Sequence, residues 1–296
     1  TMNQKTSFPR QFKLAATAVS MAVLSGCASV NFDQSLTNTN EAAADFTQGK
    51  LTLAQTKEQR DVLDQTATEI LLKPIGQSDA VRLALVNSPA LQAMLAQNWV
   101  DAANAAQSGR IANPVFTFER LRFVDELEIG RLLAFGLLDV LTLPQRYGIA
   151  QRQIAQAQLR LTSSVIEQVT QVRQAWVKAV AAQQTLIYAR QVNDAAQASA
   201  ELARRMQAAG NFTKLQRARQ QAFYADAATG WAAAQHTSTS TREELVRLLG
   251  LTDTQAARLV LPDRLPDMPG SPRAPDEVSR QASSGRLDIK IAQTEF

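Results

Sequence analysis

One residue in the sequence stands where covalent chemistry is expected, and it is the single cysteine of the 296 residues, Cys27. It closes an apolar run, residues 14–24, which follows three basic residues and no acidic one. A basic start, a short apolar middle and small residues at the end are typical of a secretory signal. The run is too short for a membrane-spanning helix, which needs about 20 residues. We therefore expect residues 1–26 to be removed as a signal peptide.

The stretch Leu24-Ser25-Gly26-Cys27 resembles the lipobox of bacterial lipoproteins. The resemblance implies that diacylglycerol alkylates the thiol of Cys27 and that cleavage leaves this cysteine first. Several acyl chains then anchor such a protein stably. Ala28 stands in place of the aspartate that tends to retain lipoproteins at the inner membrane, so the expected location is the outer membrane. The alternative is an ordinary export signal with an incidental cysteine.

No other residues have the types and spacing of a catalytic, cofactor or metal site. His236 is the only histidine and has no cysteine or histidine near it in sequence, so a solvated side chain is expected. Ser163-Ser164 and the Thr/Ser run 237–240 have no recognisable histidine base, and no glycine-rich phosphate loop is present. The sequence therefore predicts a protein that is not an enzyme and that has no cofactor.

The formal charge of +4 does not indicate an anionic ligand. It arises from 31 basic and 27 acidic residues, and three of the basic ones lie in the predicted signal, which leaves 28 against 27. No basic run is visible in the sequence. Nucleic-acid binding, which calls for a basic patch on one face, is therefore not expected.

The elements predicted around these residues are mostly long helices, because Gly (12) and Pro (10) are scarce. Residues 27–76 are predicted as a polar tether followed by a short helix. A helical region then begins and is interrupted at Asn87-Ser88-Pro89. A long helix over about 145–209 and a return helix over about 213–249 complete the set, with a turn at Gly210-Asn211 between them.

The long helix is predicted to form a coiled coil with the return helix. Its apolar residues recur at spacings of four and three, which is typical of such a seam: Leu161, Val165, Val169, Val172, Trp176 and Ala179. The return helix has a stripe of small residues that would permit close helix approach: Ala218, Ala222 and Ala225. The predicted fold is mainly α, with long antiparallel coiled-coil helices.

A β-hairpin is predicted between the helical regions, with strands over about 113–121 and 126–135. One face of the second strand is apolar, with Arg131 as the exception, and carries Leu127, Ile129, Leu133 and Phe135. Strands of about ten residues fit a tilted, membrane-crossing strand of a β-barrel. A soluble hairpin packed on helices would show the same pattern. Charged residues near the turn fit an extracellular rim or any solvated turn: Glu119, Arg120, Arg122, Asp125, Glu126 and Glu128.

The end of the chain is expected to begin a second copy of the same unit. Residues 77–261 form the first helix, hairpin, helix, helix repeat, and 262–275 is a proline-rich connector. Asp276-Glu277-Val278 then echoes Asp79-Ala80-Val81, which gives a period of about 200 residues. Residues 276–296 would be the start of a second repeat that is cut short.

These parts, in this order, resemble the TolC-like outer membrane efflux proteins. The resemblance rests on four stretches: DAVRLALVNSPALQA (79–93), SGRIANPVFTFERL (108–121), ARRMQAAGNFTKLQRARQQAFYADA (203–227) and ELVRLLGL (244–251). It implies a homotrimer in which each protomer gives strands to one shared outer membrane β-barrel and long helices to an α-barrel that crosses the periplasm. Such a protein is a passive conduit for export, and its partners are a periplasmic adaptor protein and an inner membrane pump.

The resemblance also places the adaptor contact at the turn between the two long helices. The residues concerned are Ala209, Gly210, Asn211, Phe212, Thr213 and, packed beneath them, Leu215. Gly210 is alternatively only a helix stop. One hairpin in each of three chains would give six strands, whereas the smallest bacterial barrels have about eight strands. The alternative from another class is a lipid-anchored periplasmic coiled-coil scaffold without a pore.

Overall fold

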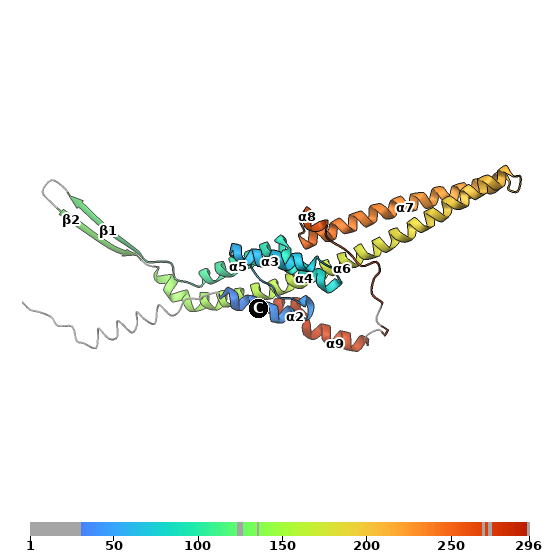
Figure 1. Cartoon of the computed structure of the whole chain (residues 1–296). Helices are drawn as coiled ribbons and strands as arrows, with labels where there is room; N and C mark the ends of the chain where they lie inside the picture. The colour runs from blue at the N-terminus through green and yellow to red at the C-terminus, as the bar shows by residue number, and fades with distance from the viewer. Residues whose placement is uncertain (1–30, 123–126, 135, 268–269, 272–273, 295–296) are drawn as a thin grey trace, which may run out of the picture. The chain divides into compact units, whose positions relative to one another are not determined.

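The computed structural model describes residues 31–122, 127–134, 136–267, 270–271 and 274–294, so Cys27 and Phe135 lie outside the described residues. The described chain is mainly helical and contains one antiparallel hairpin (Figure 1), which confirms that part of the predicted fold. The elements are α2 (Phe32–Thr47), α3 (Lys57–Ile70), α4 (Gln77–Asn87), α5 (Pro89–Ser108), β1 (Val115–Arg122), β2 (Leu127–Ala134), α6 (Leu137–Ala208), α7 (Lys214–Leu249), α8 (Asp253–Ala256), α9 (Pro275–Gly285) and α10 (Leu287–Gln293).

The chain divides into two compact units, and each is described by itself. Unit 1 comprises Thr1–Gln34, Gln97–Leu159 and Lys290–Phe296, and it contains the hairpin, the end of α5 and the start of α6. Unit 2 comprises Ser35–Ala96 and Arg160–Ile289, and it contains α3, α4, the rest of α6 and all of α7.

Residues 32–47, predicted as part of a polar tether, form helix α2. In unit 2 the side-chain amide of Asn40 accepts a hydrogen bond from the N–H of Leu51 (2.7 Å) and donates one to the Leu51 carbonyl (3.2 Å). Thr39, Ala43 and Leu51 are fully buried. Hydrophobic periodicity did not indicate this helix, because two of its four buried residues are the threonines Thr39 and Thr47.

The apolar core of unit 2 surrounds the middle of α6. All six residues of the predicted apolar series are buried there: Leu161, Val165, Val169, Val172, Trp176 and Ala179. The indole N–H of Trp176 donates to the carbonyl of Ile75 at 3.0 Å, which satisfies a donor that would otherwise be costly to bury. The core therefore fixes α6 against the segment that precedes α4.

Two of the stretches that carry the family resemblance meet in unit 2. α4 ends at Asn87 and α5 begins at Pro89, and the Asn87 amide donates to the carbonyls of Leu249 (3.1 Å) and Gly250 (2.8 Å). Gly250 has a φ of +65°, and a β-carbon there would lie 2.9 Å from the Cα of Ser88. The end of α7 is thus fixed against the break between α4 and α5.

α6 and α7 form a long antiparallel helix pair (Figure 1), as predicted. Near the end of α6 the buried residues recur at spacings of three and four: Asn193, Ala196, Ala200 and Ala203. The predicted small stripe of α7 is not at this interface, because Ala218, Ala222 and Ala225 are all exposed. α7 instead turns Tyr224, Trp231 and Ala234 inward. Covering the aromatic rings removes more apolar area from water than covering alanines would.

α9 and α10 repeat the pattern of α4 and α5. α4 and α9 each have 11 residues, and one residue separates each from the next helix: Ser88 in the first case and Arg286 in the second. α9 begins and ends 198 residues after α4 (275 against 77, 285 against 87), and α10 begins 198 residues after α5 (287 against 89). The offset is close to the expected repeat period of about 200 residues.

Candidate functional site

The hairpin of unit 1 exposes nearly all of its side chains. Its register pairs Val115 with Ala134 at the base and Arg122 with Leu127 beside the turn. Directly opposed residues of an antiparallel pair share one face of the sheet. The described residues of the predicted lipid-facing set share one face and are about half exposed: Leu127 (51%), Ile129 (48%) and Leu133 (59%).

The register sorts the charged residues of the two strands by sign. The arginine face carries Arg120, Arg122 and Arg131 among large apolar residues, which are Phe116, Phe118, Leu127, Ile129 and Leu133. The glutamate face carries Glu119 and Glu128 among Val115, Thr117, Leu121, Gly130, Leu132 and Ala134. Arg131 is therefore not isolated on its face, because two arginines of β1 share it. The sequence did not show this sorting, since the alignment of β1 with β2 depends on the strand register.

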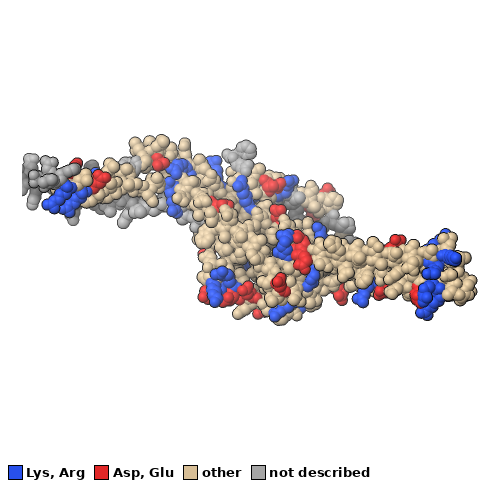
Figure 2. Space-filling model, turned by 90° about the horizontal axis from the view of Figure 1, so that it is seen from above, with Lys and Arg blue, Asp and Glu red and all other residues tan. Residues whose placement is uncertain are grey.

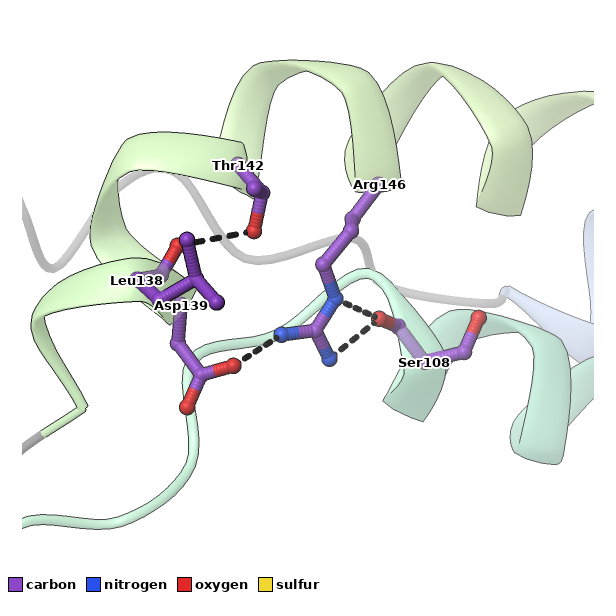
Figure 3. A network of polar contacts seen from close by, with 5 residues as sticks. All are labelled: Ser108, Leu138, Asp139, Thr142 and Arg146. Carbon is purple, nitrogen blue, oxygen red and sulfur yellow. Dashed lines mark hydrogen bonds and ion pairs between the residues drawn. The ribbon is translucent and has the colours of Figure 1, made fainter.

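A polar network joins the end of α5 to the start of α6 (Figure 3). The Arg146 guanidinium donates to the carbonyl of Ser108 through Nε (3.1 Å) and Nη2 (2.8 Å), and to the carboxylate of Asp139 through Nη1 (2.9 Å). The carbonyl of Ser108 lies at the helix end, where no intrahelical N–H is left to bind it. Arg146 thus caps α5 with a side chain from α6.

The same network accounts for the early start of α6, at Leu137 instead of about residue 145. Pro144 lies inside the helix and removes the N–H that would bond to the carbonyl of Val140. The pair between Asp139 and Arg146 bridges the proline, and the hydroxyl of Thr142 donates to the carbonyl of Leu138 (2.9 Å) within the preceding turn. These side-chain contacts support the turn that the proline weakens.

A hollow of about 600 Å³ in unit 1 lies beside the network and includes Trp99, Arg110, Asp139 and Arg146 in its wall. Arg146 already binds both Ser108 and Asp139. An anionic ligand would meet the Asp139 carboxylate beside the arginines. We therefore regard the hollow as a gap in a structural junction.

The turn between α6 and α7, predicted as an adaptor contact, is an open apex. Gly210 has a φ of +78°, and no atom lies within 4 Å of the position that a β-carbon would take. Thr213 caps α7 through a capping box with Gln216. Ala209, Gly210, Asn211 and Thr213 are exposed, Phe212 is half-buried and Leu215 is 60% exposed. Leu215 therefore lies open to solvent instead of packing beneath the turn.

Basic residues surround the helix ends next to this apex, and Figure 2 shows Lys and Arg gathered at the end of the α6–α7 pair. They are Arg204, Arg205, Lys214, Arg217 and Arg219, and all five are exposed. The sequence does not show this group as one basic run, because the neutral turn divides it into two short clusters. Antiparallel pairing of α6 with α7 brings the clusters together, as the hydrogen bond from Arg217 to Gln207 (3.2 Å) indicates.

One carboxylate lies within the group. Glu201 accepts hydrogen bonds from Arg204 through Nε and Nη2 (2.8 Å each) and from Arg205 through Nε (2.8 Å). The bonds from Arg204 and then Arg205 lower the pKa of the Glu201 carboxyl to about 2, so it stays charged at every physiological pH. Its negative charge is shared between the two arginines of α6.

In the described part of the chain, no group of three or more His, Cys, Asp and Glu could hold a metal ion. His236 is exposed on α7. Among the described helices, none is both long and apolar enough to cross a membrane.

No protein-family model and no curated protein matches the sequence. Among solved structures, the chain is similar to a membrane protein from Pseudomonas aeruginosa, with a TM-score of 0.52 and 19% identity. The match covers 82% of this chain and 55% of that one, so the chain spans a little over half the length of that protein. At this identity the similarity is one of fold.

Proposed function

We propose that the protein is a lipid-anchored outer membrane channel component of a tripartite efflux system. In this proposal the hairpin contributes strands to a shared β-barrel, α6 and α7 form part of a tunnel wall across the periplasm, and Cys27 carries the lipid. The protein is then a passive conduit, and an inner membrane pump supplies the energy. The observation that carries the proposal is the hairpin, which exposes apolar residues on both faces.

The hairpin is unsuited to stand alone in water. An isolated two-stranded hairpin is at best marginally stable, and its unpaired edges are open to pairing with other strands. Closure into a barrel with neighbouring protomers would pair both edges. Each strand has 8 residues, close to the about 9–11 of a membrane-crossing strand. A barrel therefore accounts for the exposed side chains and for the unpaired edges together.

The arginine face is the better candidate for contact with lipid. It carries the larger apolar side chains, among them Phe116, Phe118 and Leu133. Arg120 and Arg122 lie toward the turn, where long cationic side chains can reach the headgroups. Arg131 lies in the middle of β2 on the same face, and an arginine at the bilayer centre costs about 2–4 kcal/mol, which the surrounding apolar side chains must offset. The glutamate face, with Gly130 and Thr117, would then line the lumen.

A pore requires more strands than this hairpin supplies. Three copies give six strands, and a closed barrel needs about eight or more. The match of α9 and α10 to α4 and α5 supports a second hairpin in each protomer of a homotrimer. The exposed alanines of α7 (Ala218, Ala222 and Ala225) suit close approach of a neighbouring helix in the tunnel wall.

Leu132 and Leu133 allow a matched test, because the two residues are of one type, adjacent and on opposite faces. Each is replaced by cysteine and labelled with bimane in outer membranes that contain brominated lipid, with the unmodified chain as the background control. We expect quenching of the label at Leu133→Cys and not at Leu132→Cys. Equal and weak quenching at both positions would instead favour the scaffold without a pore.

The lipid anchor has a separate test. Cys27→Ala is expected to abolish incorporation of labelled palmitate and to release the protein from the membrane fraction if the hairpin does not retain it. Palmitate incorporation that persists in this variant would contradict acylation at Cys27.

A further inference from the structure

We propose that the end of the α6–α7 pair is a docking surface for a partner that presents carboxylates, and that this partner is an acidic, elongated protein segment lying alongside the two helix ends. This inference rests on the proposed function, since it names the surface chemistry of the partner at the tip. It is drawn from the charges, exposure and spacing of residues 200–219.

The net charge of the chain is concentrated at this tip. Residues 200–219 contain five of the 31 basic residues and one of the 27 acidic residues, so the other 276 residues contain 26 of each. The tip therefore carries a formal charge of +4, which is the net charge of the whole sequence. A concentrated field of one sign steers a partner of the opposite sign and raises its association rate.

Three of these cations have no anionic partner among the described residues. Arg204 and Arg205 already form ion pairs with Glu201. Arg217 donates only to the neutral amide of Gln207, and Lys214 and Arg219 make no hydrogen bond or ion pair within the described chain. Carboxylates of a partner would give these groups charge-assisted hydrogen bonds without breaking an existing pair.

The tip also offers apolar contact between the charges. Leu202 is 59% exposed and Leu215 is 60% exposed. Protein interfaces combine an apolar centre with arginines and a polar rim, and arginine is enriched among the residues that contribute most to binding. The composition of this surface therefore suits a protein partner with both carboxylates and aliphatic side chains.

The position of the charges argues against a flat anionic surface such as a phospholipid bilayer. Residues 209–212 at the apex are uncharged. Lys214 follows them by two residues, while Arg205 lies four residues before them and Arg217 five residues after them. At 1.5 Å per residue these guanidinium groups are set back by about 6–8 Å, close to the Debye length of about 8 Å at physiological salt. An elongated segment that passes beside the apex can reach them.

The experiment compares binding of a synthetic helical peptide of Glu, Leu and Ala to three forms of the purified full-length chain. The tip variant is Lys214→Gln/Arg217→Gln/Arg219→Gln. The control, Arg152→Gln/Arg190→Gln/Lys290→Gln, removes the same charge from exposed positions elsewhere. We expect the control to bind as the unmodified chain does, and the tip variant to bind about tenfold or more weakly, with binding reduced by salt in every form.

Equal weakening in both variants would overturn the inference, because net charge alone would then account for binding. Binding of a peptide with Gln in place of Glu would overturn it as well. Phosphatidylglycerol vesicles serve as the lipid probe, and their tip-dependent binding without peptide binding would assign the surface to lipid instead. If the peptide binds at the tip while the labels at Leu132→Cys and Leu133→Cys show no difference, the docking surface stands and the pore does not. If the peptide does not bind while the label at Leu133→Cys is quenched and the label at Leu132→Cys is not, the pore stands and the docking surface does not.

Discussion

Two long helices of this protein end in the same way but in different surroundings. Gly210 follows α6 and Gly250 follows α7, with φ values of +78° and +65°. Each turn is closed by the bond that accompanies a left-handed glycine, from Asn211 N–H to the Met206 carbonyl (2.9 Å) and from Leu251 N–H to the Val246 carbonyl (3.1 Å). Gly250 is packed against the segment 87–89, whereas nothing lies near Gly210. The same local motif therefore fixes a core in one place and presents an open surface in the other.

The largest expected effect follows from adding one methyl group at the packed turn. Gly250→Ala introduces a side chain at a positive φ and places its β-carbon against Pro89 Cδ and 2.9 Å from Ser88 Cα. A left-handed conformation costs about 1–2 kcal/mol, and overpacking adds about 1–3 kcal/mol. We expect a loss of about 3 kcal/mol in the free energy of unfolding, measured by chemical denaturation followed by circular dichroism.

A matched control distinguishes the effect of the packed turn from the effect of replacing any glycine by alanine. Gly230 lies inside α7 with nothing near its missing side chain. Gly230→Ala is expected to stabilise the protein by about 0.5–1 kcal/mol, because alanine favours a helix. If Gly250→Ala were as harmless as Gly230→Ala, the contact between the end of α7 and residues 87–89 would not be important for stability.

The next prediction concerns the hydrogen bonds between Asn87 and the end of α7. Asn87→Ala removes the hydrogen bonds to the carbonyls of Leu249 and Gly250 and leaves both acceptors without this donor. Loss of a partly buried bonded pair costs about 1–3 kcal/mol. We expect the midpoint of thermal unfolding to fall by several degrees. An unchanged midpoint would indicate that water replaces the amide without loss.

The sequence predicted where the two long helices end but not what surrounds each end. Gly210 and Gly250 both follow long helical patterns, and Asn87-Ser88-Pro89 clearly interrupts one, so local rules were sufficient for these boundaries. The contact between Asn87 and Leu249 joins residues 162 positions apart. No pattern within either segment indicates such a contact. The early start of α6 was missed for a similar reason, because Arg146 supports the helix across Pro144 from outside the local pattern.

The candidate sites also combine features that the sequence predicts with features that it does not. Alternation along β2 predicted which of its residues share a face, but the sorting of arginines and glutamates across both strands depended on the register. The apex was predicted from Gly210, whereas the basic group around it was missed, because pairing of α6 with α7 assembles it from two clusters. Properties of one segment could be predicted from sequence, and properties that arise between segments could not.

A smaller effect on stability is expected at the open turn. Gly210→Ala meets no neighbouring atom, so only the cost of a left-handed alanine remains, about 1 kcal/mol. Unfolding measured as for Gly250→Ala should show the smaller loss. Under the proposed function this variant should reduce export in an exporter-dependent strain by more than its stability explains, since the turn conformation shapes the apex. Equal losses of stability at the two glycines would contradict the contrast drawn between them.

The smallest effect on stability concerns Glu201, which is partly exposed at the tip. The pKa of its carboxyl is lowered to about 2 by hydrogen bonds from Arg204 and then Arg205. A group with a depressed pKa in the folded state contributes stability above its ordinary pKa, here 4.5, and the contribution is lost as the pH falls through about 2. The difference in thermal midpoint between the unmodified chain and Glu201→Gln should thus be small at pH 7 and vanish toward pH 2. Because Glu201→Gln also removes the only acidic residue among residues 200–219, it should strengthen binding of the acidic peptide at pH 7 while it slightly weakens the fold. A variant that binds the peptide more strongly but folds less stably would show that the charges at the open turn, unlike those at the packed turn, are arranged for a partner.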